Sequence, residues 1–210
     1  MLRNERIGFA VTDGFVVTVL VLLLLCGVRG TVAVFLCSIL HESAHLLAVL
    51  LRKGKVLAVR CNLGGFTIES SQICGGYAGE LLCLAAGAGC NLLAGFLLVY
   101  IFAKNEYLYM LAGANITVGL FNLVPCGFFD GGRILYLCAE YFAGPERARA
   151  VCRSVSAVSA CLVLGGGLLL FLRSGREPTV LLTAFYLSFL LGYDIILSFP
   201  GRFHRVRTSA

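Results

Sequence analysis

Charged side chains are scarce in this sequence of 210 residues. They make up only 13% of the residues, whereas hydrophobic residues make up 59%, and the mean hydropathy is +0.92. A typical soluble domain carries about 25% charged residues, so a soluble domain this apolar could not cover its surface with polar groups. The shortage of charge excludes an ordinary soluble protein and indicates a single integral membrane domain over residues 1–210.

The sequence also has no long linker, no internal repeat and no low-complexity segment. Six apolar runs reach the roughly 20 residues that a transmembrane helix needs. They cover residues 11–28, 31–51, 80–103, 107–125, 154–172 and 179–199. The first run is too long for the apolar core of a cleaved signal peptide, and the second follows it almost at once. We therefore expect an all-α membrane protein, a polytopic bundle of six transmembrane helices.

Basic residues are concentrated on one side of the expected bundle. With the N-terminus in the cytoplasm, 13 of the 17 Lys and Arg residues lie on the cytoplasmic side. This excess follows the positive-inside rule and predicts a multi-pass protein of the cell membrane with both termini in the cytoplasm. Since these residues are dispersed over membrane-flanking loops, the net charge of +6 does not indicate a nucleic-acid partner.

The ten cysteines lack the C-x-x-C spacing that is typical of thiolate zinc sites. Most of them lie in or beside the expected spans, where a thiol behaves as a small hydrophobic group. We expect reduced cysteines in a protein whose loops face the cytosol. Cys126 differs from the others because it lies inside a motif that is described below.

Two loops between the expected spans have a distinct composition. Residues 55–70 are rich in β-branched side chains and contain a Gly-Gly break, which predicts a small β-hairpin at the membrane surface. Residues 140–153 are charged, and we expect them to form a cytoplasmic connection into the fifth span. Neither loop is long enough for an additional soluble domain.

The second apolar run contains three ionisable side chains in the pattern His-Glu-x-x-His, at His41, Glu42 and His45. On a helix, residues four apart lie on one face, so both imidazoles can bind one zinc ion. They lie about 9 Å from the cytoplasmic end of the run, too deep for a histidine to reach water. Burying these groups there without a partner would cost several kcal/mol, which favours a metal site. Glu42 is then the candidate general base that takes a proton from metal-activated water.

A catalytic zinc ion needs a third protein ligand and an open position for water. The remaining histidine, His204, is in the C-terminal tail, so the ligand must be a carboxylate or a thiol. Asp130 and Asp194 are the carboxylates near the ends of later spans. Asp130 follows a segment that proline and glycine keep out of a regular helix, "NLVPCGFFDGG". Broken backbone at membrane depth occurs where it is buried in protein or lines a wet cavity, which favours Asp130.

The pairing of "HESAH" with "NLVPCGFFDGG" resembles the site-2 protease family of intramembrane zinc metalloproteases. Its compact six-span branch, found in spore-forming bacteria, cleaves a membrane-tethered sigma-factor precursor. The resemblance implies one zinc ion bound by His41, His45 and Asp130, with Glu42 as the catalytic base. It also implies a membrane-associated sheet that pairs with an unwound substrate strand. The orientation inferred from the basic residues predicts an active site that opens toward the cytoplasm.

A third segment of the sequence, "LAAGAGCN" at residues 84–91, resembles the family's G-P-x-x-N pattern. By this resemblance Asn91 binds the substrate or its oxyanion, although an interhelical hydrogen bond would suit a buried amide equally well. Asn122 belongs to the aspartate motif and is a further candidate for substrate binding or for support of the loop. Ala88, Phe128 and Phe129 depart from the common family pattern without removing a ligand or the base.

The partners expected are the lipid bilayer, a single-span or membrane-associated protein substrate such as a sigma-factor precursor or anti-sigma factor, and a membrane regulatory protein. Two other functions would use the same residues. A metal-ion or proton transporter would use the ionisable side chains as a pathway, but the sequence lacks the inverted repeats typical of transporters. A non-catalytic scaffold that binds membrane clients would not need Glu42.

Overall fold

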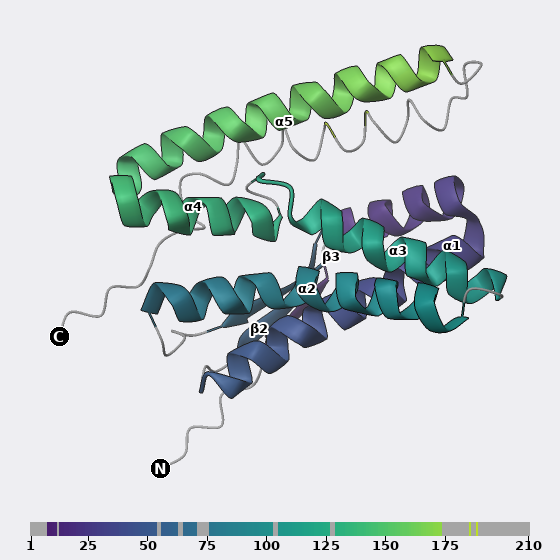
Figure 1. Ribbon diagram of the computed structural model, residues 1–210, viewed down its shortest axis with the longest axis horizontal. Helices are drawn as coiled ribbons and strands as arrows, with labels where there is room; N and C mark the ends of the chain where they lie inside the picture. The colour runs from purple at the N-terminus through teal and green to yellow at the C-terminus, as the bar shows by residue number, and fades with distance from the viewer. Residues whose placement is uncertain are drawn as a thin grey trace. The chain divides into compact units, whose positions relative to one another are not determined.

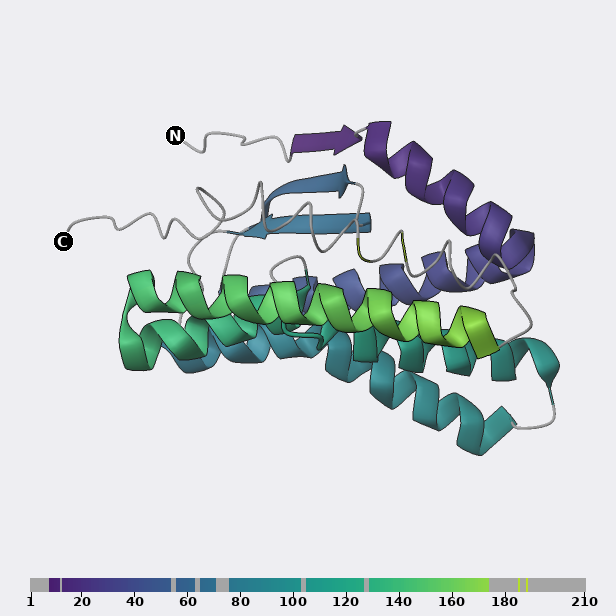
Figure 2. The ribbon, with the colours of Figure 1, turned by 90° about the horizontal axis from the view of Figure 1, so that it is seen from above.

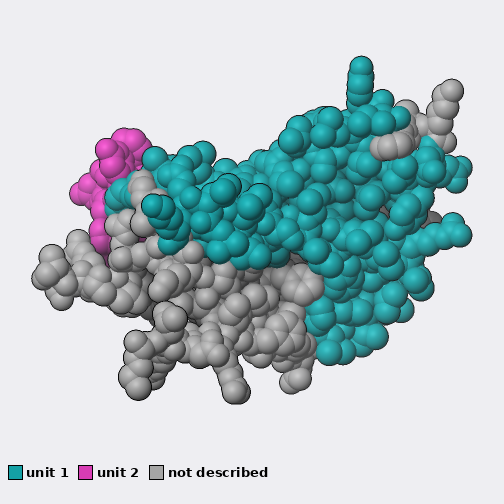
Figure 3. Space-filling view, turned by 90° about the horizontal axis from the view of Figure 1, so that it is seen from below, with its two compact units in different colours: residues 1–123 teal, residues 124–210 magenta. Residues whose placement is uncertain are grey.

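The computed structural model describes residues 8–11, 13–53, 56–62, 65–70, 76–102, 105–126, 129–173, 185 and 188. The chain divides into two compact units, residues 1–123 and residues 124–210, which Figure 3 colours separately. Each unit is described by itself below. Among the described residues, the first unit has three helices and a small sheet, and the second has two helices (Figure 1).

Helix α1 (Asp13–Leu51) is bent at Gly27, where the backbone leaves the helical region (φ 63°, ψ −178°). A positive φ of this kind is readily adopted only by glycine, because other residues have a Cβ that clashes. A straight helix of this length would measure about 58 Å, nearly twice the thickness of a bilayer's hydrocarbon core. The bend lies near the end of the first predicted span, residues 11–28, and the Thr31 hydroxyl donates a hydrogen bond to the Gly27 carbonyl (2.8 Å).

Helices α2 (Gly76–Phe102) and α3 (Glu106–Asn122) pack closely against each other. A Cβ on Gly95 would lie 3.0 Å from the Ala112 carbonyl oxygen, and one on Gly119 would lie 3.1 Å from the Ala88 carbonyl oxygen. Glycine thus brings the two backbones together, as is common between membrane helices. Asn105 caps the start of α3 by accepting hydrogen bonds from two backbone N–H groups of the first turn.

The sheet consists of β1 (Gly8–Val11), β2 (Val56–Asn62) and β3 (Gly65–Ser70), in the order β1-β2-β3 (Figure 2). β2 and β3 are antiparallel and lie in the segment for which the sequence predicts a hairpin. β1 pairs with β2 in parallel, with Gly8 opposite Ala58, and was not expected from the sequence. The location of this sheet at a membrane surface stays a prediction.

In the second unit, α4 (Asp130–Ala143) and α5 (Pro145–Arg173) meet at Gly144, whose φ is 82°. The prediction that residues 140–153 form a loop is wrong, because they are helical on both sides of Gly144. Near the start of α5, Arg149 and Glu146 form an ion pair at 2.6 Å. Proline at the first position of α5 fits this arrangement, since its missing N–H is not needed there. The described part of this unit has a buried core cluster of Tyr136, Ala148 and Cys152.

Three helices in the described part of the chain are long and apolar enough to cross a membrane. They are Phe15–Leu51, Gly76–Ile101 and Pro145–Arg173. The last two helices contain most of the predicted third and fifth spans. With several helices of this kind, the chain is a multi-pass membrane protein. α3 covers most of the predicted fourth span with 17 residues, the lower limit of length for a span. The predicted sixth span, residues 179–199, lies outside the described residues except at positions 185 and 188, so six spans stay a prediction.

Candidate metal centre

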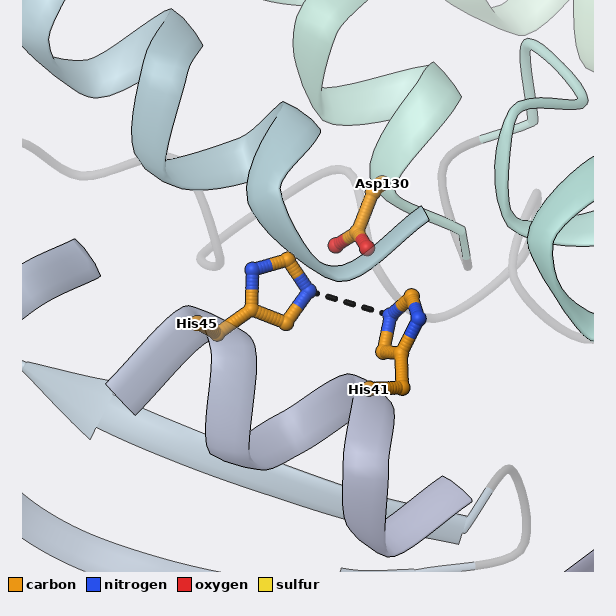
Figure 4. A group of neighbouring side chains, drawn as sticks. All are labelled: His41, His45 and Asp130. Atoms are coloured by element: carbon orange, nitrogen blue, oxygen red, sulfur yellow. Dashed lines mark hydrogen bonds between the residues drawn. The ribbon is translucent and has the colours of Figure 1, made fainter. Parts of the chain in front are cut away.

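The two histidines of the His-Glu-x-x-His motif lie on the part of α1 that follows Gly27, and their side chains approach each other. The His41 and His45 rings are 4.6 Å apart between centroids and nearly perpendicular, and their Nε2 atoms are 3.0 Å apart (Figure 4). His41 is only 4% exposed. These two imidazole nitrogens can supply two of the four ligands of a zinc ion, as the four-residue spacing predicts.

The tautomer of His45 follows from its contact with helix α2. Its Nδ1 lies 2.7 Å from the backbone carbonyl oxygen of Cys83. A carbonyl only accepts hydrogen bonds, so Nδ1 carries the proton and donates it. Nε2, which faces His41, then keeps its lone pair. This is the arrangement typical of zinc-binding histidines, whose second nitrogen is held by a carbonyl or carboxylate.

Gly87 of α2 lies directly against both imidazoles. A Cβ at this position would lie 2.7 Å from His41 Nε2 and closer still to His45 Nε2. Any other residue would therefore push the two rings or the helix away. The sequence analysis did not select Gly87, although the run of small residues "AAGAG" at residues 85–89 signals that something approaches α2 closely here.

The candidate substrate-binding amides both donate to backbone carbonyls. Asn91 is fully buried, and its Nδ2 donates to the Cys37 carbonyl of α1 at 3.3 Å. Asn122 is half-buried at the end of α3 and donates to the Val118 carbonyl one turn earlier, at 2.9 Å. Asn91 thus makes an interhelical contact, whereas Asn122 supports the end of its own helix.

Asp130 is the first residue of α4 and is 9% exposed. It follows a non-helical segment in which tight turns link Cys126 to Val124 (2.7 Å) and Phe129 to Cys126 (2.9 Å). The helix break that the sequence predicts around Pro125 is confirmed between the end of α3 and Asp130. A side chain in the first turn of a helix lies at the positive end of the helix dipole, where negative charge is stabilised.

His41, His45 and Asp130 form one group of potential metal ligands. One ligand atom from each lies within 4.8 Å of the others (Figure 4). Two imidazoles and one carboxylate are a ligand set of catalytic zinc sites, in which a fourth position is open to water or substrate. Asp130 belongs to the second unit, and its assignment to one ion together with the histidines is part of the proposed function.

The other candidates from the sequence do not belong to this group. Glu42 follows His41 on α1 and is half-buried. Cys126, the alternative thiol ligand, is 1% exposed and is not one of the three grouped residues. Asp194 and His204 lie outside the described residues.

Comparisons with known sequences give a family match and a curated relative. Residues 103–165 match the family model described as Peptidase family M50. A stretch of 70 residues is 34% identical to a protein of Ralstonia nicotianae that is provisionally named a zinc metalloprotease. That stretch is 32% of this chain but only 15% of the length of the relative.

The fold is also similar to that of a solved structure. The site-2 protease from Methanocaldococcus jannaschii matches with a TM-score of 0.68 at 20% identity, over 93% of this chain and 94% of that one. At this identity the likeness concerns the fold. Together with the M50 match, it confirms the resemblance that the two sequence motifs indicated.

Proposed function

We infer that this chain belongs to the site-2 branch of the M50 peptidases, and we propose that it is an intramembrane zinc endopeptidase. The observation that carries the proposal is the convergence of His41, His45 and Asp130, whose ligand atoms lie within 4.8 Å of one another. These residues come from the two motifs that are most specific for the family. We propose that all three bind one Zn²⁺ ion.

The zinc ion, when bound, supplies a Lewis acid that polarises a carbonyl and lowers the pKa of water to about 7. The chain's own residues supply the rest. The backbone carbonyl of Cys83 accepts a hydrogen bond from the Nδ1–H of His45 and so keeps the Nε2 lone pair directed at the site. Glu42 takes the proton from the attacking water and delivers it to the leaving amine. The burial of His41 excludes bulk water, which strengthens these electrostatic contacts.

The substrate in this proposal is a protein segment within or tethered to the membrane. A helical substrate must unwind before its peptide bond can be attacked, because its amides are bonded internally. β3 is the last strand in the sheet order, so its outer edge can accept an unwound substrate segment as a further strand. We propose a sigma-factor precursor or an anti-sigma factor as the client, with Asn122 stabilising the last turn of α3 before the loop to Asp130.

The topology is part of the same proposal. Six spans with both termini in the cytoplasm agree with the distribution of basic residues. His45 is six residues before the end of α1 at Leu51, and the basic residues Arg52 and Lys53 follow. The path for water therefore opens toward the cytoplasm.

The proposal is tested in proteoliposomes that contain the purified protein, zinc and a single-span reporter substrate. Glu42→Gln should retain stoichiometric zinc but lose cleavage by about 10²- to 10⁴-fold, the contribution of general acid–base catalysis. Asp130→Ala should lose both zinc and cleavage. Glu106→Gln, the same chemical change at an exposed position of α3, is the matched control.

Either of two results would contradict the assignments. Undiminished cleavage by Glu42→Gln would remove its role as the base. Full zinc retention by Asp130→Ala, measured by metal analysis of the purified variant, would remove the third ligand.

A further inference from the structure

The interface between helices α1 and α2, called the seam below, is formed by residues spaced four apart on each helix. On each helix three residues, spaced four apart, occupy the seam. They are Cys37, His41 and His45 on α1, and Cys83, Gly87 and Asn91 on α2. Their contacts pair them in antiparallel order: His45 meets Cys83, Gly87 meets both imidazoles, and Asn91 meets Cys37.

At each end of the seam, a polar side chain of one helix donates a hydrogen bond to a backbone carbonyl of the other helix. The donor belongs to α1 at one end and to α2 at the other. At one end, His45 of α1 donates to a carbonyl of α2 (2.7 Å). At the other end, Asn91 of α2 donates to a carbonyl of α1, that of Cys37 (3.3 Å). The Cys37 carbonyl is four residues before His41, so in an α-helix it also accepts the N–H of His41 itself. Asn91 is therefore attached to the turn of α1 that carries the first proposed ligand.

We propose that Asn91 is a positioning residue for the metal centre. Its amide holds α2 against the turn of α1 that carries His41. This contact keeps the Nε2 atoms of His41 and His45 directed at one metal position beside Gly87. This inference rests on the proposed function, in that the two histidines bind zinc. It differs from a role in holding substrate, because Asn91 is fully buried and its donor is directed at Cys37.

The buried oxygen of Asn91 supports a role other than stability. Among the described residues, Asn91 Oδ1 has no hydrogen-bond partner. A buried acceptor without a partner is costly, and an apolar side chain would remove that cost. The Cys37 carbonyl would keep its bond from the His41 N–H in such a variant. Replacement of Asn91 by an apolar residue should therefore leave a folded protein and alter mainly the position of the histidines.

Asn115 of α3 provides a matched control. It is also buried (3% exposed), and its Oδ1 also has no partner among the described residues. Its Nδ2, however, donates to the Leu111 carbonyl of its own helix, at 3.0 Å. Asn91 and Asn115 thus differ mainly in whether the amide joins two helices.

The test measures zinc affinity by competition with a chelator, without substrate, in the purified full-length protein. Asn91→Leu should weaken zinc binding by about tenfold or more, the range seen when the partner of a metal ligand is removed. Asn115→Leu should not change the affinity. Cleavage by Asn91→Leu should fall at limiting zinc and recover at saturating zinc. Should Asn91→Leu not fold, Asn91→Ala with Asn115→Ala gives the same comparison with smaller side chains.

Unchanged zinc affinity together with a lower kcat at saturating zinc would overturn the inference and favour an oxyanion contact. An equal loss of affinity in both asparagine variants would also overturn it. Failure of the unaltered protein to bind zinc would instead contradict the proposed function.

Discussion

Helix α2 has a glycine on each of two faces, and the groups that pack against these two glycines differ. Toward α3, the space at Gly95 is filled by the Ile116 side chain and the Ala112 backbone. Toward α1, the space at Gly87 is filled by the rings of His41 and His45. The same lack of a side chain thus serves close helix packing on one face and the approach of two candidate metal ligands on the other. The comparison predicts that equal substitutions on the two faces have unequal consequences.

The largest effect is expected on the imidazole face. Gly87→Ala places a methyl group within 2.7 Å of His41 Nε2 and must displace the rings. We expect zinc affinity to fall by about a hundredfold, the upper range for disturbed metal ligands, and cleavage to be lost with it. Zinc content after chelator competition measures this. Gly89→Ala is the matched control, because a Cβ at Gly89 meets nothing within 4 Å. Equal zinc affinities in the two variants would refute the close contact.

A smaller effect, on stability rather than on zinc, is expected on the other face. Gly95→Ala must displace Ile116 or separate α2 from α3. Overpacking of this kind costs about 1–3 kcal/mol in the free energy of unfolding. Titration with a denaturing detergent, followed by circular dichroism, measures this loss. Gly113→Ala of α3, where a Cβ would meet nothing within 4 Å, should leave the stability nearly unchanged. A loss of zinc affinity in Gly95→Ala at full stability would show that the two faces are not separate.

The smallest effect on zinc affinity is expected at Cys83, where a substitution distinguishes the role of the backbone carbonyl from that of the thiol. His45 donates to the carbonyl of Cys83, which any residue at this position retains. Cys83→Ala should therefore bind zinc as tightly as the unaltered protein, within about twofold, although the loss of a buried sulfur costs about 1 kcal/mol of stability. A large loss of zinc from Cys83→Ala would make the thiol, rather than the carbonyl, the important group.

The metal-site candidates were more predictable from the sequence than the elements around them. His41 and His45 share one helix, so a four-residue spacing was enough to predict that their rings converge. Asp130 needed a second local signal, the proline and glycine break before it. The sequence analysis separated the first two apolar runs at residues 29–30, but it did not predict the bend at Gly27, which lies inside the first run.

The features that were missed depend on distant parts of the chain. β1 has four residues and is defined only by its pairing with β2, about fifty positions later, which no local pattern encodes. Gly87 was missed because a glycine carries no information about which side chains fill the space beside it. Residues 140–153 were mistaken for a loop because charge was read as a sign of irregular structure, whereas the structure has helices interrupted at Gly144.

The bend at Gly27 also has a mechanical consequence for the histidines. In an unbroken rod, any twist of the N-terminal half would turn the imidazoles about the rod's axis. At Gly27 the rod is interrupted, and the Thr31 hydroxyl satisfies the carbonyl at the interruption. The ligand-bearing half of α1 therefore takes its orientation from its packing against α2 and α3 rather than from one continuous helix.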